Sequence, residues 1–181
     1  MQYPPPLADI NRVTTLKILG VTVTNHLSVS EHVRGIISSC AQTLYAMRVL
    51  RARGMCSDAL HAIYRSVVVA KITYASSAWW GFSTAADRQR IDAFFRRSKR
   101  CGMCPIDLLS FEEHCRTADS KLFRNVLSDC THVLFKLLPP QSAASQNYNL
   151  RKRHHNRELT SSKTTLISQN FTNRMLFMDS Y

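Results

Sequence analysis

The apolar residues in the middle of the chain recur every three or four positions, which is the spacing of one face of an α-helix. The most apolar run, residues 59–82, predicts a central helix that ends near Gly81. Few polar residues interrupt it, so we expect other helices to pack on more than one side. Arg65 and Lys71 lie within the run, which excludes a membrane span because a span needs about 20 almost uncharged residues. The stripe at helical spacing consists of Leu60, Ile63, Tyr64, Val67, Val68, Lys71, Ile72 and Ala75.

A second helix is predicted before the central one. It begins either at a capping box of Ser28 with Glu31 or at Ser30, which is an equally good N-cap. It runs to about Arg53 and is stopped by Gly54. Its apolar face consists of Val33, Ile36, Ile37, Cys40, Leu44, Met47 and Leu50. The basic residues of its last turns complement the helix dipole, and these are Arg48, Arg51 and Arg53.

Two further helices and a short one are predicted after the central run. Thr84 caps the first of them, with Asp87 in its first turn. A capping box of Ser110 with Glu113 opens the second, and residues 129–138 predict a short helix that ends at two prolines. The expected core positions are Ile91, Phe94, Phe95 and Ser98 in the first helix and Cys115, Ala118, Leu122, Val126 and Leu127 in the second.

The two ends of the chain have different patterns. Residues 1–14 form a Pro-rich lead, and the alternation after it predicts a short β element, either one strand bent at Gly20 or two short strands. Residues 141–181 are a basic connector and a short apolar segment that we expect to dock back. The predicted fold is therefore mainly α: a small helical bundle at residues 15–140, with a short N-terminal β element and a basic, partly disordered C-terminal tail.

The charge balance suggests what the bundle contacts. The chain has 24 lysines and arginines against 12 aspartates and glutamates, which gives a formal net charge of +12. This charge is clustered, so nucleic acid is the expected partner, with a solvated face that serves only solubility as the alternative. The candidate phosphate-binding residues are Arg88, Arg90, Arg96, Arg97, Lys99 and Arg100 on one helix, and Arg151, Lys152, Arg153 and Arg157 in the connector.

Residues of catalytic or metal-binding type form no strong pattern. The five glycines are spread singly and no carboxylate pair suits Mg²⁺, so we predict no catalytic residue, no metal and no cofactor. The six cysteines follow no apolar signal sequence, which indicates reduced thiols in the nucleus or cytoplasm. Cys101 and Cys104 leave three alternatives open: a redox pair, two thiols in a loop, or a zinc site. His114, Cys115, Cys130 and His132 follow downstream, and the second ligand pair of a zinc site would be His114 with Cys130 or His132.

Several motifs follow one another in a recognisable order. They are KILGVTVTNHLSVSEHV, LYAMRVLRARGM, IYRSVVVAKITYASSAWWGF, DRQRIDAFFRRSKRCGMCP, ADSKLFRNVLSDCTHVLFKLLPP, YNLRKRHHNREL and FTNRMLFMDSY. Together they resemble the C-terminal part of reverse transcriptases of non-LTR retrotransposons, of the LINE-like jockey and CR1 type. The resemblance covers residues 16–181, nearly the whole chain.

The resemblance implies a role beside a polymerase palm. Leu19, Gly20 and Val21 would lie at a primer-grip-like region, and the helices of residues 30–81 would be thumb-like. The thumb of the family holds the template–primer duplex. The implied partners are therefore RNA, DNA or an RNA–DNA hybrid, together with the palm of a related polymerase in trans.

The chain departs from the family where catalysis occurs. The polymerase binds two metal ions through palm aspartates, and this sequence has no adjacent pair of aspartates. The fingers, most of the palm and the endonuclease are missing too, so the chain looks like a truncated copy or a fragment without polymerase activity, and Mg²⁺ would belong to the missing palm. The alternatives are a truncated-element product without independent function and a protein–protein module. The module would use apolar residues exposed by the missing palm, namely Trp79, Trp80, Phe94, Phe95 and Met175 to Phe177.

Overall fold

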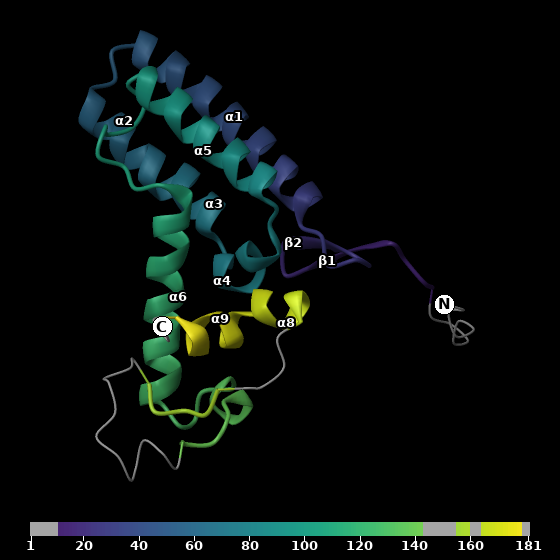
Figure 1. Ribbon diagram of the computed structural model, residues 1–181. Helices are drawn as coiled ribbons and strands as arrows, with labels where there is room; N and C mark the ends of the chain where they lie inside the picture. Colours follow the sequence, from purple (N-terminus) through teal and green to yellow (C-terminus); the bar gives the residue numbers. More distant parts are fainter. Residues whose placement is uncertain (1–10, 143–154, 160–163, 179–181) are drawn as a thin grey trace.

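The computed structural model describes residues 11–142, 155–159 and 164–178. It is mainly helical, with a two-stranded antiparallel sheet near the N-terminus (Figure 1), and the predicted fold class is thereby confirmed. Most of the Pro-rich lead and three of the predicted basic residues, Arg151, Lys152 and Arg153, lie outside the described residues. None of the helices in the described ranges has the length and apolar content needed to cross a membrane.

The β element is a hairpin of two short strands. Strand β1 (Thr15–Ile18) pairs with β2 (Val21–Thr24), and Ile18 faces Val21 across the turn. The two turn residues both have positive φ, 45° at Leu19 and 88° at Gly20. Two-residue hairpin turns with positive φ match the twist of the strands, which explains the glycine. Of the two alternatives left open by the sequence, the pair of short strands is the one that forms.

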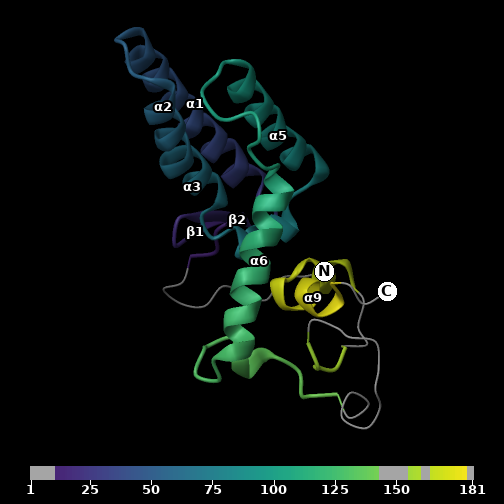
Figure 2. The same cartoon turned by 90° about the vertical axis from the view of Figure 1, so that its left-hand side faces the viewer.

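Helices α1 (Ser30–Ala52) and α5 (Ala85–Arg100) lie side by side in both views (Figures 1 and 2). The predicted apolar faces of both helices are largely buried between them and the rest of the bundle. The capping box predicted at Ser28 and Glu31 is wrong, because the N-cap of α1 is Val29 and no side chain caps it. The Ser30 hydroxyl instead donates a hydrogen bond to a carboxylate of α5, which gives the start of α1 a tertiary partner.

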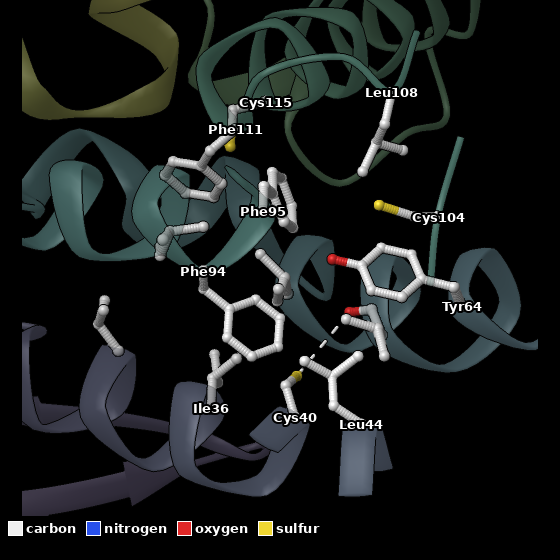
Figure 3. Close-up of a cluster of buried hydrophobic side chains, with 14 of the residues drawn as sticks. Ile36, Cys40, Leu44, Tyr64, Phe94, Phe95, Cys104, Leu108, Phe111 and Cys115 are labelled. Carbon is white, nitrogen blue, oxygen red and sulfur yellow. Dashed lines mark hydrogen bonds between the residues drawn. The ribbon is translucent and has the colours of Figure 1, made fainter. Parts of the chain in front are cut away.

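A further part of the bundle is a helical segment that changes from α-helix to π-helix and back. It starts as α2 (Ser57–Ile63), continues as the π-helix η1 (Tyr64–Val69) and ends as α3 (Ala70–Thr73). Its core-facing residues are Leu60, Tyr64, Val68 and Ile72, each fully buried. In Figure 3, Tyr64 lies in one apolar core with side chains of α1, of α5 and of the segment that follows α5. Several helices thus surround this segment, as its sequence predicted.

The prediction of one helix over residues 59–82 is wrong at its C-terminal end. The chain turns at Tyr74 and Ala75, where Ala75 has φ 49°, and then forms α4 (Ser76–Trp79) and the 3₁₀ turn η2 (Trp80–Phe82). Trp79 is responsible in part: its ring stacks on Phe111 at a centroid distance of 5.8 Å, and its Nε1 donates to the Tyr74 carbonyl. These tertiary contacts outweigh the local helical pattern.

Helix α6 (Phe111–Ser128) leads away from the bundle. Capping boxes form at Thr84 with Asp87 and at Ser110 with Glu113, so both predicted caps are confirmed. The short helix predicted at residues 129–138 is wrong, since only the 3₁₀ turn η3 (Phe135–Leu137) forms there. The Asp129 carboxylate accepts hydrogen bonds from the Thr131 amide and hydroxyl, a local turn that competes with a helix.

The C-terminal helices α8 (Thr165–Gln169) and α9 (Phe171–Phe177) lie against α6 and η2. A second apolar cluster forms around Phe123, Met175 and Leu176. The tryptophan and phenylalanine pairs predicted to be exposed are buried, as are Met175 and Leu176, and Phe177 is half-buried. The prediction of an exposed patch at these residues is therefore wrong, because they form the molecule's own core.

Candidate nucleic-acid interface

A basic groove runs between α1 and α5. Its volume is about 570 Å³, and its walls carry side chains from both helices. The lining residues are Arg34, Ile37, Ser38, Arg90, Ala93, Arg96, Arg97 and Arg100. Five of these eight are arginines and none is acidic. This surface, called the basic groove below, therefore concentrates positive charge along an apolar floor.

A smaller hollow continues the basic groove toward the C-terminal ends of the two helices. It measures about 170 Å³ and shares Ile37 and Arg97 with the groove. Arg48 and Cys101 line it as well, over a floor of Ala41, Leu44, Phe94 and Met103. The two hollows together follow the seam of α1 and α5 over most of its length.

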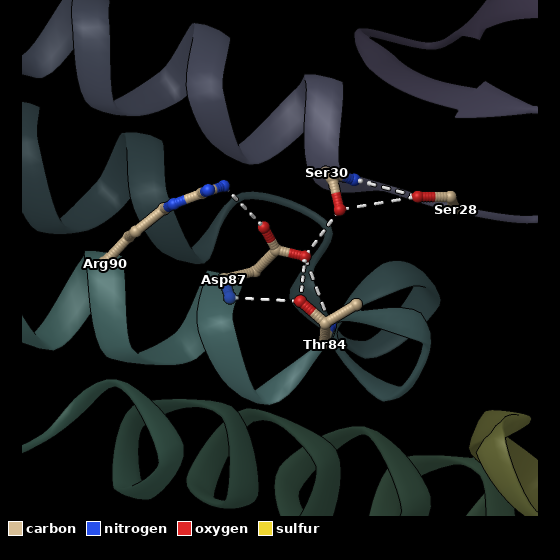
Figure 4. A network of polar contacts seen from close by, with 5 residues as sticks. All are labelled: Ser28, Ser30, Thr84, Asp87 and Arg90. Carbon is tan, nitrogen blue, oxygen red and sulfur yellow. Dashed lines mark hydrogen bonds and ion pairs between the residues drawn. The ribbon is translucent and has the colours of Figure 1, made fainter.

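Asp87 joins the N-terminal ends of the two helices (Figure 4). Its Oδ2 accepts hydrogen bonds from the hydroxyls of Ser30 on α1 and Thr84 at the N-cap of α5, each at 2.7 Å. Its Oδ1 lies 3.3 Å from Nη1 of Arg90. Burial would raise the pKa of Asp87, but these hydrogen bonds and the Arg90 charge lower the pKa below its ordinary value. The carboxylate therefore stays charged and fixes where the groove begins.

Arg51 joins the other ends of the helices. Its Nη1 donates a 2.6 Å hydrogen bond to the carbonyl oxygen of Cys101, the C-cap residue of α5. The same carbonyl end attracts cations because the helix dipole is negative there. The sequence predicted only that Arg51 complements the dipole of its own helix. Contacts at both ends, with Asp87 and Arg51, hold α1 and α5 parallel and in register.

Most of the groove's arginines have no carboxylate partner. Arg34, Arg96, Arg97 and Arg100 are exposed, and within the described ranges no acidic group lies at ion-pair distance from them. Arg90 pairs with Asp87, yet 55% of its side chain remains exposed. Like charges held together without counter-charges create a positive potential that attracts anions.

Three of the predicted phosphate-binding residues contact other parts of the fold and do not line the basic groove. Arg88 donates to the hydroxyl and carbonyl oxygens of Ser83 and lies 5.6 Å from the Trp80 ring. Lys99 donates a 2.7 Å hydrogen bond to the Leu108 carbonyl. Arg157 donates to the Pro139 carbonyl and stacks over a phenylalanine ring. These contacts hold loops in place. Among the members of the predicted set that the structure describes, it is Arg90, Arg96, Arg97 and Arg100 that come together in the basic groove.

The sequence reasoning missed the contribution of α1. Arg34 was not singled out, and Arg48 was interpreted only as a complement to the helix dipole. Both lie at helical spacing beside the apolar face of α1, with Ser38 and Ala41 between them. That spacing shows that they share a flank of the helix. Only the parallel pairing with α5 turns this flank into one wall of a groove.

The primer-grip-like residues lie at the hairpin and outside the basic groove. Leu19 is 86% exposed, Gly20 completes the turn and Val21 is buried. The Tyr74 hydroxyl donates a 3.2 Å hydrogen bond to the Leu19 carbonyl, which fixes the turn against the bundle. A separate apolar pocket of about 410 Å³ opens here, lined by Ile18, Leu19, Val21, Val23, Leu27, Val29, Tyr74, Ala75, Ala78, Trp79 and Phe82.

The cysteines are free thiols in different surroundings. Cys104 and Cys115 are buried in the main core, whereas Cys130 is exposed. Among the described residues, no group of three or more histidine, cysteine, aspartate or glutamate side chains is arranged to hold a metal ion. Burial raises the pKa of Cys40 to about 11 and that of Cys115 to about 12, so neither thiol is a nucleophile at neutral pH. The structure thus does not assemble the zinc ligands that the sequence left open.

Comparison of the chain with protein-family models, with curated proteins and with solved structures found no significant match. The resemblance to non-LTR reverse transcriptases therefore rests on the sequence motifs and stays a prediction.

Proposed function

We propose that this chain binds nucleic acid through the basic groove, by contacts to the sugar–phosphate backbone. The observation that carries the proposal is the concentration of five arginines, and no acid, along the seam of α1 and α5. Arginine presents several N–H donors in a plane that fits phosphate oxygens, and it stays charged at any physiological pH. Backbone contacts of this kind position a strand without selecting its sequence.

The motif resemblance gives the proposal its context. A thumb-like helical segment of a non-LTR reverse transcriptase would hold template and primer beside the polymerase palm. The chain would then be a non-catalytic, C-terminal part of an RNA-directed DNA polymerase. RNA, DNA or an RNA–DNA hybrid are the partners that both the resemblance and the charge favour.

The test compares two variants that lose the same charge. In the first, Arg34, Arg96, Arg97 and Arg100 are replaced by glutamine; these residues are exposed and line the groove. In the second, Arg53, Arg65, Lys121 and Arg124 are replaced by glutamine; these are exposed but do not line the groove or its continuation. Glutamine is a good helix former, so both variants keep the helices.

Binding is measured by fluorescence anisotropy on a labelled RNA–DNA primer–template with a single-stranded overhang. The proposal expects the groove variant to lose at least tenfold in affinity and the control variant to stay within about twofold of the unmodified protein. Equal losses in the two variants would show that the net charge of +12, rather than the groove, drives binding. Absence of binding by the unmodified protein would contradict the proposal outright.

A second candidate function is favoured by the apolar pocket at the hairpin. Its rim includes large side chains that are more than half exposed, namely Ile18, Leu19 and Tyr74. Exposed apolar surface of this kind favours a protein partner. The palm of a related polymerase is the partner that the motif resemblance implies. Replacing Ile18 and Leu19 by aspartate would abolish capture of a purified fingers–palm fragment if the pocket binds it, and would leave capture unchanged if it does not.

A further inference from the structure

An exposed aromatic side chain of α1 lies at helical spacing from residues that line the basic groove and its continuation, although it lines neither hollow itself. Tyr45 is 70% exposed, although it belongs to the middle of α1. Its neighbours at helical spacing are Ala41, four residues before it, and Arg48, three residues after it. Both line the smaller hollow that continues the groove. Tyr45 therefore shares the flank of α1 that faces the seam with α5.

The usual direction of side chains in an α-helix indicates which part of α1 the Tyr45 ring covers. Long side chains in an α-helix point back toward the N-terminus and cover the preceding turn. For Tyr45 that turn includes Ala41, a small residue that lines the hollow. Along α1, Tyr45 lies between Arg34 of the basic groove and Arg48, whose Nη2 contacts Cys101 Sγ at the C-cap of α5.

We propose that Tyr45 is a stacking platform for an unpaired base, so that the strand in the groove is single-stranded. This inference rests on the proposed function and names the form of nucleic acid that the groove takes. A single strand can place its phosphates on Arg96, Arg97 and Arg100 while one base turns onto the tyrosine ring. The bases of a duplex are stacked and paired inside it, so they offer no face to Tyr45. In a primer–template the groove would thus hold the unpaired template.

The test uses oligouridylate, which is unstructured, a hairpin duplex with the same number of phosphates, and an abasic strand of the same length. The unmodified protein should prefer oligouridylate over both other probes. Tyr45→Ala should weaken oligouridylate binding by about 5- to 150-fold, the range expected for loss of one aromatic–base stack. The same change should leave duplex and abasic binding within about twofold. Tyr45→Phe keeps the ring and should bind like the unmodified protein.

The control Val49→Ala removes another exposed side chain of α1 and should not alter binding to any probe. Alanine favours the helix at both positions, so unfolding does not confound the comparison. Equal binding of the three probes by the unmodified protein, or no effect of Tyr45→Ala on oligouridylate, would overturn the stacking role while leaving backbone binding intact. Absence of binding to every probe would overturn both this inference and the proposed function.

Discussion

Asp87 links the N-terminal ends of the two helices that form the basic groove. It is 1% exposed, and it caps its own helix while it accepts a hydrogen bond from Ser30 at the start of α1. A buried carboxylate is costly unless its oxygens are paired, and here both oxygens have partners. One side chain therefore stabilises a helix end and aligns two helices at once.

Asp87→Asn should lower the free energy of unfolding by about 1–3 kcal/mol, because it loses the charge-assisted cap and turns an amide N–H toward hydroxyl donors. The folded-state pKa of Asp87 is lowered, so its contribution is present above the ordinary value of 3.8 and is lost as pH falls through the folded-state pKa. The gap in stability between the unmodified protein and the variant should therefore shrink below about pH 4. Urea unfolding at several pH values measures the gap, and a gap that stays constant down to pH 2 would contradict the assignment.

At the scale of elements, Arg174 connects the C-terminal helices to the bundle. Its Nη2 lies 2.9 Å from Oδ2 of Asp119 on α6 and 3.1 Å from the Ser77 carbonyl. Its guanidinium also lies 4.8 Å from the centroid of the Trp80 ring. Trp80 Nε1 donates to the same Asp119 oxygen at 2.7 Å. The side chains of Arg174 and Asp119 are largely shielded from water, so each charge depends on the opposite charge of the other for its stabilisation.

Asp119→Ala should destabilise the protein by about 3 kcal/mol, because it leaves the Arg174 guanidinium without its carboxylate in a site from which water is mostly excluded. Arg174→Met in the Asp119→Ala background should recover part of that loss, since an apolar side chain needs no ion partner. A double-mutant cycle on urea unfolding measures the coupling of the two residues. Additive effects of the two changes would contradict a direct ion pair.

Gly81 lies where the C-terminal segment approaches the bundle most closely. A Cβ at this position would overlap the Arg174 guanidinium and the Gln169 carbonyl, and the carbonyl belongs to the backbone and cannot rotate away. Gly81→Ala should therefore displace α8 and α9 and increase amide hydrogen exchange in residues 165–177. Gly35→Ala is the matched control: nothing lies within 4 Å of its Cβ, so it should be neutral or stabilising. Unchanged exchange in Gly81→Ala would contradict the close packing.

The sequence was informative where structure depends on nearby residues. The caps at Thr84 and Ser110, and the end of α1 before Gly54, involve groups a few residues apart, so they could be predicted. The turn at Tyr74 and Ala75 could not, because it depends on Trp79 packing against a residue of α6. Local hydrophobic spacing does not contain that information.

The candidate site was predictable in composition but not in geometry. The run of basic residues on α5 was evident, whereas the structural use of Arg88 and Lys99 depends on oxygens of Ser83 and Leu108. The α1 wall of the groove could not be predicted, because it depends on the pairing of two helices that are far apart in sequence. The place of Arg34 in the groove is therefore evident only from the folded chain.

At the scale of the whole molecule, the excess of positive charge is distributed unevenly. Some cations, such as Arg51 and Arg174, are used to hold helices together. Others stay unpaired, within the described residues, along the basic groove. A uniform excess would make binding depend on net charge alone, whereas a groove makes it depend on position. This difference distinguishes a specific interface from general attraction to polyanions.

The most direct test of the groove is the salt dependence of binding to a labelled RNA–DNA primer–template. Each phosphate contact contributes about 0.7–0.9 to the slope of log affinity against log salt. Replacing Arg34, Arg96, Arg97 and Arg100 by glutamine should therefore reduce the magnitude of the slope by up to about 3.6. The charge-matched control variant should keep the original slope. An unchanged slope in the groove variant, or an equal reduction in both variants, would contradict binding in the groove between α1 and α5.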